Sequence, residues 1–136
     1  MKSFVNRRMQ RLLPALLLVI FALSLTACGP KGPTVVRVKL SEYTITLDKT
    51  SVPAGPIKFE IQNVGAIAHE VVLEPNGSDD APYSLNDKAS EAENIEPGKT
   101  ATLEWTLDTP GTYQLGCHTP GHFEKGMFTT FEVTAP

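Results

Sequence analysis

The feature that most limits the possible folds is a series of short segments in which apolar and polar residues alternate. In "IKFEIQ" the apolar residues Ile57, Phe59 and Ile61 share one face, and "TATLEWTL" (Thr100–Leu107) repeats the pattern. Alternation with a period of two, in segments rich in Thr, Val, Ile and aromatic residues, predicts strands. Further segments of this kind lie at residues 35–40, 43–47, 69–74, 111–117 and 128–133.

Turn-forming residues separate the alternating segments. The turns are expected at Pro53–Pro56, Asn63–Ala66, Glu74–Gly77, Glu96–Lys99 and Asp108–Gly111. About seven or eight short strands in roughly 100 residues predict an all-β sandwich. Residues 78–95 are polar and acidic and show no alternation, so a long surface loop with a short helical turn is expected there.

The N-terminal segment has the pattern of a secretory signal. Four basic residues and no acidic residue precede the apolar run Leu12–Leu25, which is shorter than the roughly 20 residues that span a membrane. The run ends in "LTAC", which resembles the bacterial lipobox, whose cysteine receives a lipid. We therefore predict a signal peptide at residues 1–27, a lipidated Cys28 with a tether to residue 34, and one domain at 35–136. The domain is expected to be exported and anchored to a membrane by its lipid. The alternatives are an uncleaved membrane anchor and an ordinary secretory signal that is cut nearby.

The net charge and the number of cysteines limit the classes of function that are possible. Four of the 12 basic residues lie before Cys28 and all 15 acidic residues after it, so the remainder has 8 basic residues and a formal net charge of −7. This balance disfavours binding to nucleic acid. With Cys28 lipidated, Cys117 is the one remaining thiol, and an exported domain with a lone thiol is prone to oxidation unless the sulfur is occupied.

Soft metal-binding side chains gather in one short stretch. The stretch "GCHTPGHFEKGM" contains Cys117, His118, His122 and Met127, and the chain has one further histidine, His69. A thiolate, imidazoles and a thioether favour copper, with zinc as the competitor. Structural zinc sites use several cysteines in paired spacings, which this chain lacks. Two histidines, one cysteine and a weak axial methionine are the ligands of an electron-transfer copper centre.

The spacing allows four of these side chains to meet at one metal ion. The turn "HTPG" after Cys117 returns His122 to the same point, "FEKG" brings Met127 round, and His69 begins a neighbouring strand. We predict these four residues as the copper ligands. His118 follows the cysteine directly in an extended segment, so its side chain should point the opposite way, outside the ligand set.

These residues resemble the cupredoxins, single-domain blue copper proteins. The resemblance covers nearly the whole domain and is carried by "NVGAIAHEVVL", "PGKTATLEWTL" and "PGTYQLGCHTPGHFEKGM". In the family an Asn-x-Gly turn precedes the first histidine ligand, as Asn63 and Gly65 precede His69, and a tyrosine often stands four residues before the cysteine ligand, as Tyr113 stands before Cys117. The resemblance implies a Greek-key sandwich and one copper ion per chain, with the cysteine and both histidines equatorial and the methionine axial.

The ligand loop departs from the family's usual lengths. Four residues separate Cys117 from His122, as in azurin-like loops, and four separate His122 from Met127, as in plastocyanin. The hybrid length leaves the equatorial ligands unaffected but does not fix the Cu–Met bond length or the reduction potential.

Two surfaces are candidates for contact with a redox partner. In the family an apolar patch surrounds the second histidine ligand, which implies that His122 passes the electron, and the candidate patch is Ala66, Ile67, Ala68, Pro120 and Phe123. A set of acidic residues is either a docking patch for a basic partner or a solvated loop: Asp79, Asp80, Asp87, Glu91, Glu93 and Glu96.

Three functions are compatible with such a copper site. The first is a monomeric, membrane-tethered electron carrier, not an enzyme, that shuttles electrons between partners such as a cytochrome and an oxidase or reductase. The alternative is copper delivery or storage, but such proteins favour exposed Met-rich or His-rich sites, and Met127 is the one methionine beyond the signal. A copper enzyme needs a second metal bound by further histidines, and only His118 is left over.

Overall fold

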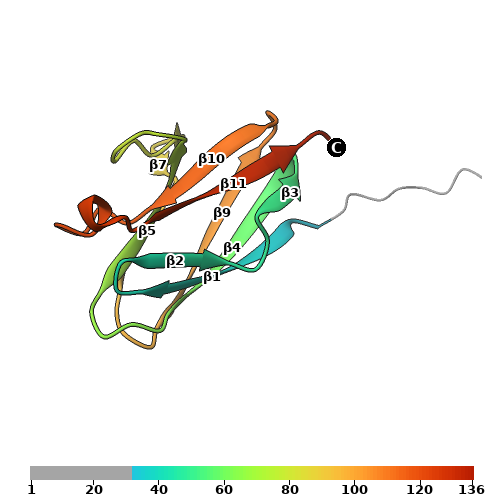
Figure 1. Cartoon of the computed structure of the whole chain (residues 1–136). Coiled ribbons are helices and arrows are strands. Elements are labelled where there is room, and N and C mark those ends of the chain that lie inside the picture. Colours follow the sequence, from blue (N-terminus) through green and yellow to red (C-terminus); the bar gives the residue numbers. More distant parts are fainter. Residues whose placement is uncertain (1–31) are drawn as a thin grey trace, which may run out of the picture. The chain divides into compact units, whose positions relative to one another are not determined.

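The computed structural model describes residues 32–136, drawn in colour in Figure 1. Residues Gly32–Pro136 form one compact unit. The predicted signal peptide and the lipidated Cys28 lie outside the described residues, so both stay predictions. Within residues 32–136, no helix has the length and apolar character needed to cross a membrane.

Strands make up almost all of the regular structure. In chain order they are β1 (Thr34–Ser41), β2 (Thr44–Leu47), β3 (Ser51–Pro53), β4 (Gly55–Asn63), β5 (His69–Pro75), β6 (Ser84–Leu85), β7 (Lys88–Ala89), β8 (Glu91–Ile95), β9 (Thr100–Leu107), β10 (Gly111–Gly116) and β11 (Phe128–Thr134). The short 3₁₀ helix η2 (Phe123–Lys125) lies between β10 and β11.

Nine of the strands form two sheets that share one core (Figure 1). The first sheet has the order β2-β1-β4-β9 and the second the order β3-β11-β10-β5-β8. The pairs β1–β4 and β3–β11 are parallel, and the remaining pairs are antiparallel. Phe59 of the first sheet meets Phe131 of the second edge-on, with ring centroids 5.7 Å apart. The predicted all-β sandwich is thus confirmed.

The alternation seen in the sequence becomes the inside and the outside of the sandwich. On β4 the side chains of Ile57, Phe59 and Ile61 are buried, whereas their neighbours Lys58 and Glu60 are only partly buried. Burying one large apolar side chain of this kind stabilises the fold by about 1.5–3 kcal/mol. The core therefore fixes the strands, and the ends of these strands fix the loops at one end of the sandwich.

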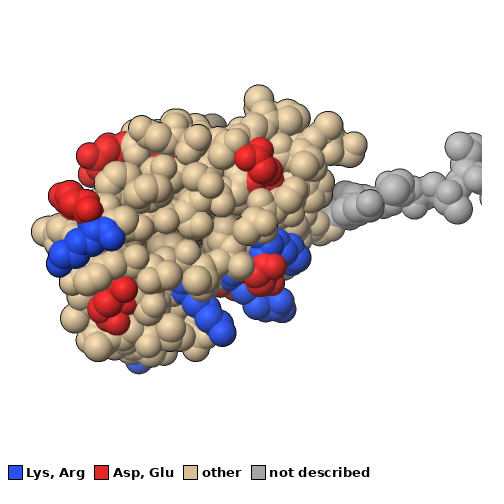
Figure 2. All heavy atoms as spheres, in the orientation of Figure 1, with Lys and Arg blue, Asp and Glu red and all other residues tan. Residues whose placement is uncertain are grey.

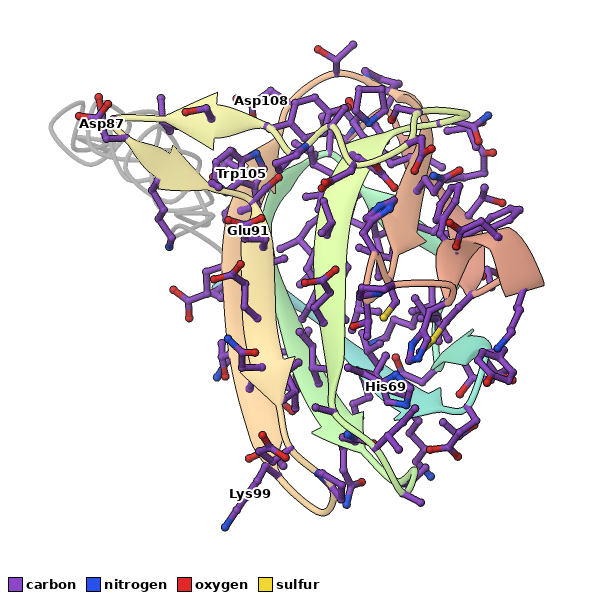
Figure 3. The ribbon with its side chains drawn as sticks, turned by 90° about the vertical axis from the view of Figure 1, so that its left-hand side faces the viewer. His69, Asp87, Glu91, Lys99, Trp105 and Asp108 are labelled. Atoms are coloured by element: carbon purple, nitrogen blue, oxygen red, sulfur yellow. The ribbon has the colours of Figure 1, made fainter. Side chains whose placement is uncertain are left out.

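Residues 78–95 differ from the expectation of a loop with a short helical turn. They form the two-stranded hairpin β6–β7 and then β8, which pairs with β5 at the edge of the second sheet. The hairpin turns at Asn86 and Asp87, whose φ angles of 52° and 61° suit a two-residue turn, and Figure 3 shows Asp87 at its tip. Because β8 is an edge strand with Ile95 as its one fully buried residue, its sequence carries little alternation.

Candidate metal centre

The four predicted ligands come from the ends of adjacent strands. His69 is the first residue of β5, and Cys117 follows the last residue of β10. These strands are antiparallel neighbours, so the start of β5 and the end of β10 lie at the same end of the sheet. His122 and Met127 lie on either side of η2, in the loop that leads to β11. Figure 3 shows the His69 side chain on the same side of β5 as the two sulfur atoms, drawn in yellow.

Three of the donor atoms form a compact triangle. Nδ1 of His69 lies 3.2 Å from Nδ1 of His122 and 3.9 Å from Sγ of Cys117, and the Cys117–His122 separation is 3.5 Å. An ion at the centre of such a triangle, with bonds of about 2.0–2.3 Å, requires donor separations of about 3.5–4.0 Å. All three residues are buried, and they are the one group of this kind in the described chain. The two separations that involve Sγ lie in this range, and the nitrogen–nitrogen separation of 3.2 Å is slightly shorter. The triangle is therefore close to that of a metal ion bound by two imidazoles and a thiolate.

Met127 lies buried beside this triangle. Its side chain has no exposed surface, and its backbone is joined to two of the ligands. The Cys117 N–H donates to the Met127 carbonyl (3.0 Å), and the Met127 N–H donates to the His122 carbonyl (3.1 Å). Gly126, at φ 88°, provides the left-handed residue that ends η2 and turns the chain toward Met127. These bonds hold the three residues of the loop in a fixed relation, with a soft thioether available as the axial donor.

A buried asparagine holds the loop that precedes His69. Asn63 is fully buried, and its Nδ2 donates to the carbonyls of Ile67 (2.8 Å) and Ile95 (2.7 Å). Its Oδ1 accepts the N–H of Gly65 (2.8 Å). One side chain thus closes the turn, joins it to β8 and sets where β5 begins. This is the physical role of the Asn-x-Gly pattern seen in the sequence.

The environment of His69 favours the neutral imidazole that a metal requires. Burial lowers the pKa of His69, and a positive charge on the neighbouring His122 lowers it further, while the Glu42 carboxylate acts in the opposite direction. A metal ion binds the deprotonated nitrogen, so protons compete less with the metal for a histidine that stays neutral.

The metal-free protein is expected to lose stability as the pH falls below about 6.5, the ordinary pKa of histidine. Because the pKa of His69 is lowered in the folded state, the unfolded chain binds the proton more readily. The stability that depends on neutral His69 is present above pH 6.5 and is lost as the pH falls through the lowered pKa. Urea midpoints of the metal-free protein between pH 7.5 and 5 measure this loss. A His69→Gln variant with the same pH dependence would contradict it.

His118 lies outside the ligand group, as its position beside Cys117 predicts. Its Nε2 is 3.0 Å from Oε1 of the fully buried Glu74, and its Nδ1 is 3.3 Å from Oδ1 of Asp79. Its ring stacks on Phe123, with centroids 4.6 Å apart. The side chain therefore ties the ligand loop to the end of β5 and to the loop after it.

Two residues near the ligands were missed by sequence reasoning: Glu42 and Tyr43, in the turn between β1 and β2. The Tyr43 ring packs edge-on against His122, with centroids 5.4 Å apart, and Lys125 donates to its hydroxyl. Oε1 of Glu42 lies 3.7 Å from Nε2 of His69. The sequence carries no signal for them, because "SEYT" contains no Gly, Pro, Asn or Asp, and the left-handed φ of 63° at Tyr43 is seen only in the structure.

Comparison with known proteins agrees with this geometry. The chain is similar to the copper-resistant cuproprotein CopI of Vibrio cholerae (29% identical over 120 residues, 79% of this chain and 69% of the relative). It is also similar to the CopI of Rubrivivax gelatinosus (27% over 107 residues, 71% and 64%), so it spans about two thirds of the length of these relatives. Its fold resembles that of an auracyanin from Roseiflexus castenholzii, with a TM-score of 0.62 at 20% identity over 76% of this chain and 99% of that one.

The family model of the cupredoxin-like domain matches residues 13–130, which is most of the chain. His69, Cys117, His122 and Met127 are positioned as a type 1 copper site, so the cofactor of this fold is copper. The chain therefore belongs to the cupredoxin-like domain family.

Proposed function

We propose that this protein carries single electrons between redox partners by means of one bound copper ion. The observation that carries the proposal is the buried triangle of His69, Cys117 and His122, whose donor atoms lie close to the separations that a trigonal metal site requires. Copper bound there would supply one-electron chemistry, accepting an electron as Cu(II) and releasing it as Cu(I).

The protein's own contribution is to hold the donors still and to exclude water. Two imidazoles and one thiolate in a plane are acceptable to both oxidation states of copper, so little has to move when the electron arrives. The ligand loop is fixed by backbone hydrogen bonds, and the four ligand side chains are at most 5% exposed. With four protein donors in place, no open position is left for a substrate, so we propose a carrier and not an enzyme.

An apolar surface next to the ligands is the proposed docking site for a redox partner. Within the described residues, five large hydrophobic side chains are exposed, and four of them lie in or beside the loops that carry the ligands: Tyr43, Val64, Ile67 and Phe128. His122 itself is only 5% exposed beneath Tyr43. Figure 2 shows charged side chains of both signs toward the end of the domain that carries η2. A partner that docks there would receive the electron from His122 through the Tyr43 contact.

The proposed location is outside the cytoplasm, with a lipid on Cys28 that anchors a monomeric domain to a membrane. The support is the signal-like N-terminus, the "LTAC" sequence and the short "GPKGPT" tether. A tether would keep the carrier near membrane-bound partners, which we propose to include a cytochrome and an oxidase or reductase.

Copper delivery or storage is the second candidate, because the CopI relatives are named copper-resistant cuproproteins. The two functions require opposite behaviour on reduction. A carrier keeps its copper as Cu(I), whereas a delivery protein releases the metal to an acceptor.

Redox cycling in the presence of a Cu(I) chelator separates the two functions. The copper-loaded protein is reduced with ascorbate and reoxidised with ferricyanide over several cycles, and both the retained copper and the rate of electron exchange with a c-type cytochrome are measured. We expect the copper to stay bound and the exchange to be fast. Transfer of copper to the chelator upon the first reduction would contradict the carrier function and favour delivery.

A further inference from the structure

The far nitrogen of His69 has no hydrogen-bond partner. Nδ1 of this ring faces Cys117 and His122, so Nε2 points away from the metal triangle. The His69 side chain has no exposed surface, and Nε2 is the one buried side-chain nitrogen or oxygen without a hydrogen bond among the described residues. When Nδ1 binds a metal ion, Nε2 carries the ring proton and needs an acceptor, which metal-bound histidines almost always have.

A carboxylate stands next to this nitrogen. Oε1 of Glu42 lies 3.7 Å from Nε2 of His69, which is slightly beyond hydrogen-bond distance. The same oxygen accepts the backbone N–H groups of Ala66 (2.6 Å) and Ile67 (3.2 Å). The two loop N–H groups occupy the acceptor positions of Oε1, and an ionised carboxylate offers about two more on Oε2, so Glu42 has capacity for a third donor. Glu42 thus reaches from the β1–β2 turn to the loop that carries His69.

Gly65 leaves room for this carboxylate because it has no side chain. A Cβ atom placed on Gly65 would lie 2.5 Å from Oε1 of Glu42, so any other residue there would displace the carboxylate. The φ angle of Gly65 is not in the left-handed region, so close approach is the physical reason for a glycine at this position. The glycine of the turn "NVG" therefore allows the Glu42 carboxylate to lie against this loop.

We propose that Glu42 is a positioning residue for the copper site. Its carboxylate accepts the Nε2–H of His69 and places a negative charge behind this ligand. This inference rests on the proposed function and adds a residue to its site. A negative charge on the far side of the imidazole stabilises Cu(II) more than Cu(I), because it makes the ring a stronger donor and opposes the higher metal charge. Glu42 therefore lowers the reduction potential and orients the ring.

The Glu42→Gln variant tests the charge while it keeps an oxygen that can accept the loop N–H groups. Loss of such a partner of a metal ligand typically reduces metal affinity 10–100-fold. We expect the Cu(II) affinity to fall about tenfold with little change for Cu(I), which raises the reduction potential by about 59 mV for one electron. The matched control is Glu124→Gln, which removes an equal charge from an exposed position in η2. Voltammetry of the three copper-loaded proteins measures the shift.

The Gly65→Ala variant tests the geometry with the charge still present. Its Cβ should push the end of a flexible side chain, so the fold is expected to persist while the Glu42 carboxylate moves. The potential is expected to rise in the same direction as in Glu42→Gln. In the Cu(I) protein, ¹⁵N NMR of labelled histidine should show a slowly exchanging Nε2–H on His69 in the wild type and faster exchange in Glu42→Gln.

The outcomes separate this inference from the proposed function. A Glu42→Gln potential equal to those of the wild type and Glu124→Gln would overturn the role of Glu42 and leave the electron carrier intact. If the wild-type protein forms no reversible Cu(II)/Cu(I) couple, the proposed function fails and the role of Glu42 fails with it. A shift in Glu42→Gln that Glu124→Gln lacks is the expected result.

Discussion

Replacing Cys117 by serine is expected to abolish the intense visible colour of the copper-loaded protein and to weaken copper binding. Sγ of Cys117 is the one sulfur in the triangle with His69 and His122, and a hydroxyl is a harder and weaker donor for copper than a thiolate. Losing a partner outside the ligand set already costs 10–100-fold in metal affinity, so losing this ligand should cost more than about 100-fold. Competition titration with a chelator and visible absorption measure both effects.

A matched substitution near the sulfur provides the control. The Thr119 hydroxyl lies 3.5 Å from Sγ of Cys117 without belonging to the ligand set, so Thr119→Val should keep the colour and most of the affinity. An intensely coloured copper complex of Cys117→Ser would contradict the assignment of the sulfur as a ligand.

Replacing Asn63 by alanine is expected to destabilise the protein by about 3 kcal/mol, because three hydrogen bonds of a fully buried side chain are lost at about 1 kcal/mol each. For a domain of about 100 residues, this corresponds to a fall in melting temperature of about 12–24 °C. Copper affinity should fall as well, since Asn63 fixes the turn from which His69 enters β5. Thermal unfolding of the metal-free protein and a copper titration measure the two effects.

The neighbouring Gln62 is exposed on the same strand and provides the comparison. Gln62→Ala should change the melting temperature by little. An Asn63→Ala variant as stable as Gln62→Ala would show that the hydrogen bonds of Asn63 do not hold the turn.

Much of the sandwich could be predicted because its strands bury one face. Ile57, Phe59 and Ile61 alternate with polar residues in the sequence and are buried in the structure, so the hydrophobic pattern and the fold agree. Strands that bury little carry no such pattern. The hairpin β6–β7 has no fully buried residue and β8 has one, and for this reason the sequence of residues 78–95 predicts a surface loop with a short helical turn.

The ligands could be predicted from donor chemistry, whereas their supporting residues could not. Cys117, His122 and Met127 lie close together in the sequence and belong to residue types that bind soft metals, and the structure brings His69 to the same point. Glu42 is 27 positions before His69, and a glutamate in a turn carries no special signal. Its contact with His69 depends on how β1, β2 and the loop after β4 pack together, which alternation does not encode.

Cys117, His69, His122 and Met127 are expected to bind one copper ion as a type 1 site. The most direct test is to add one equivalent of Cu(II) to the purified protein and to record its visible absorption and electron paramagnetic resonance spectra. A type 1 site predicts an intense thiolate-to-copper charge-transfer band and a small copper hyperfine splitting, both from the covalent Cu–Sγ bond. A colourless or faintly coloured complex, with the wide hyperfine splitting of copper bound by nitrogen and oxygen alone, would contradict it.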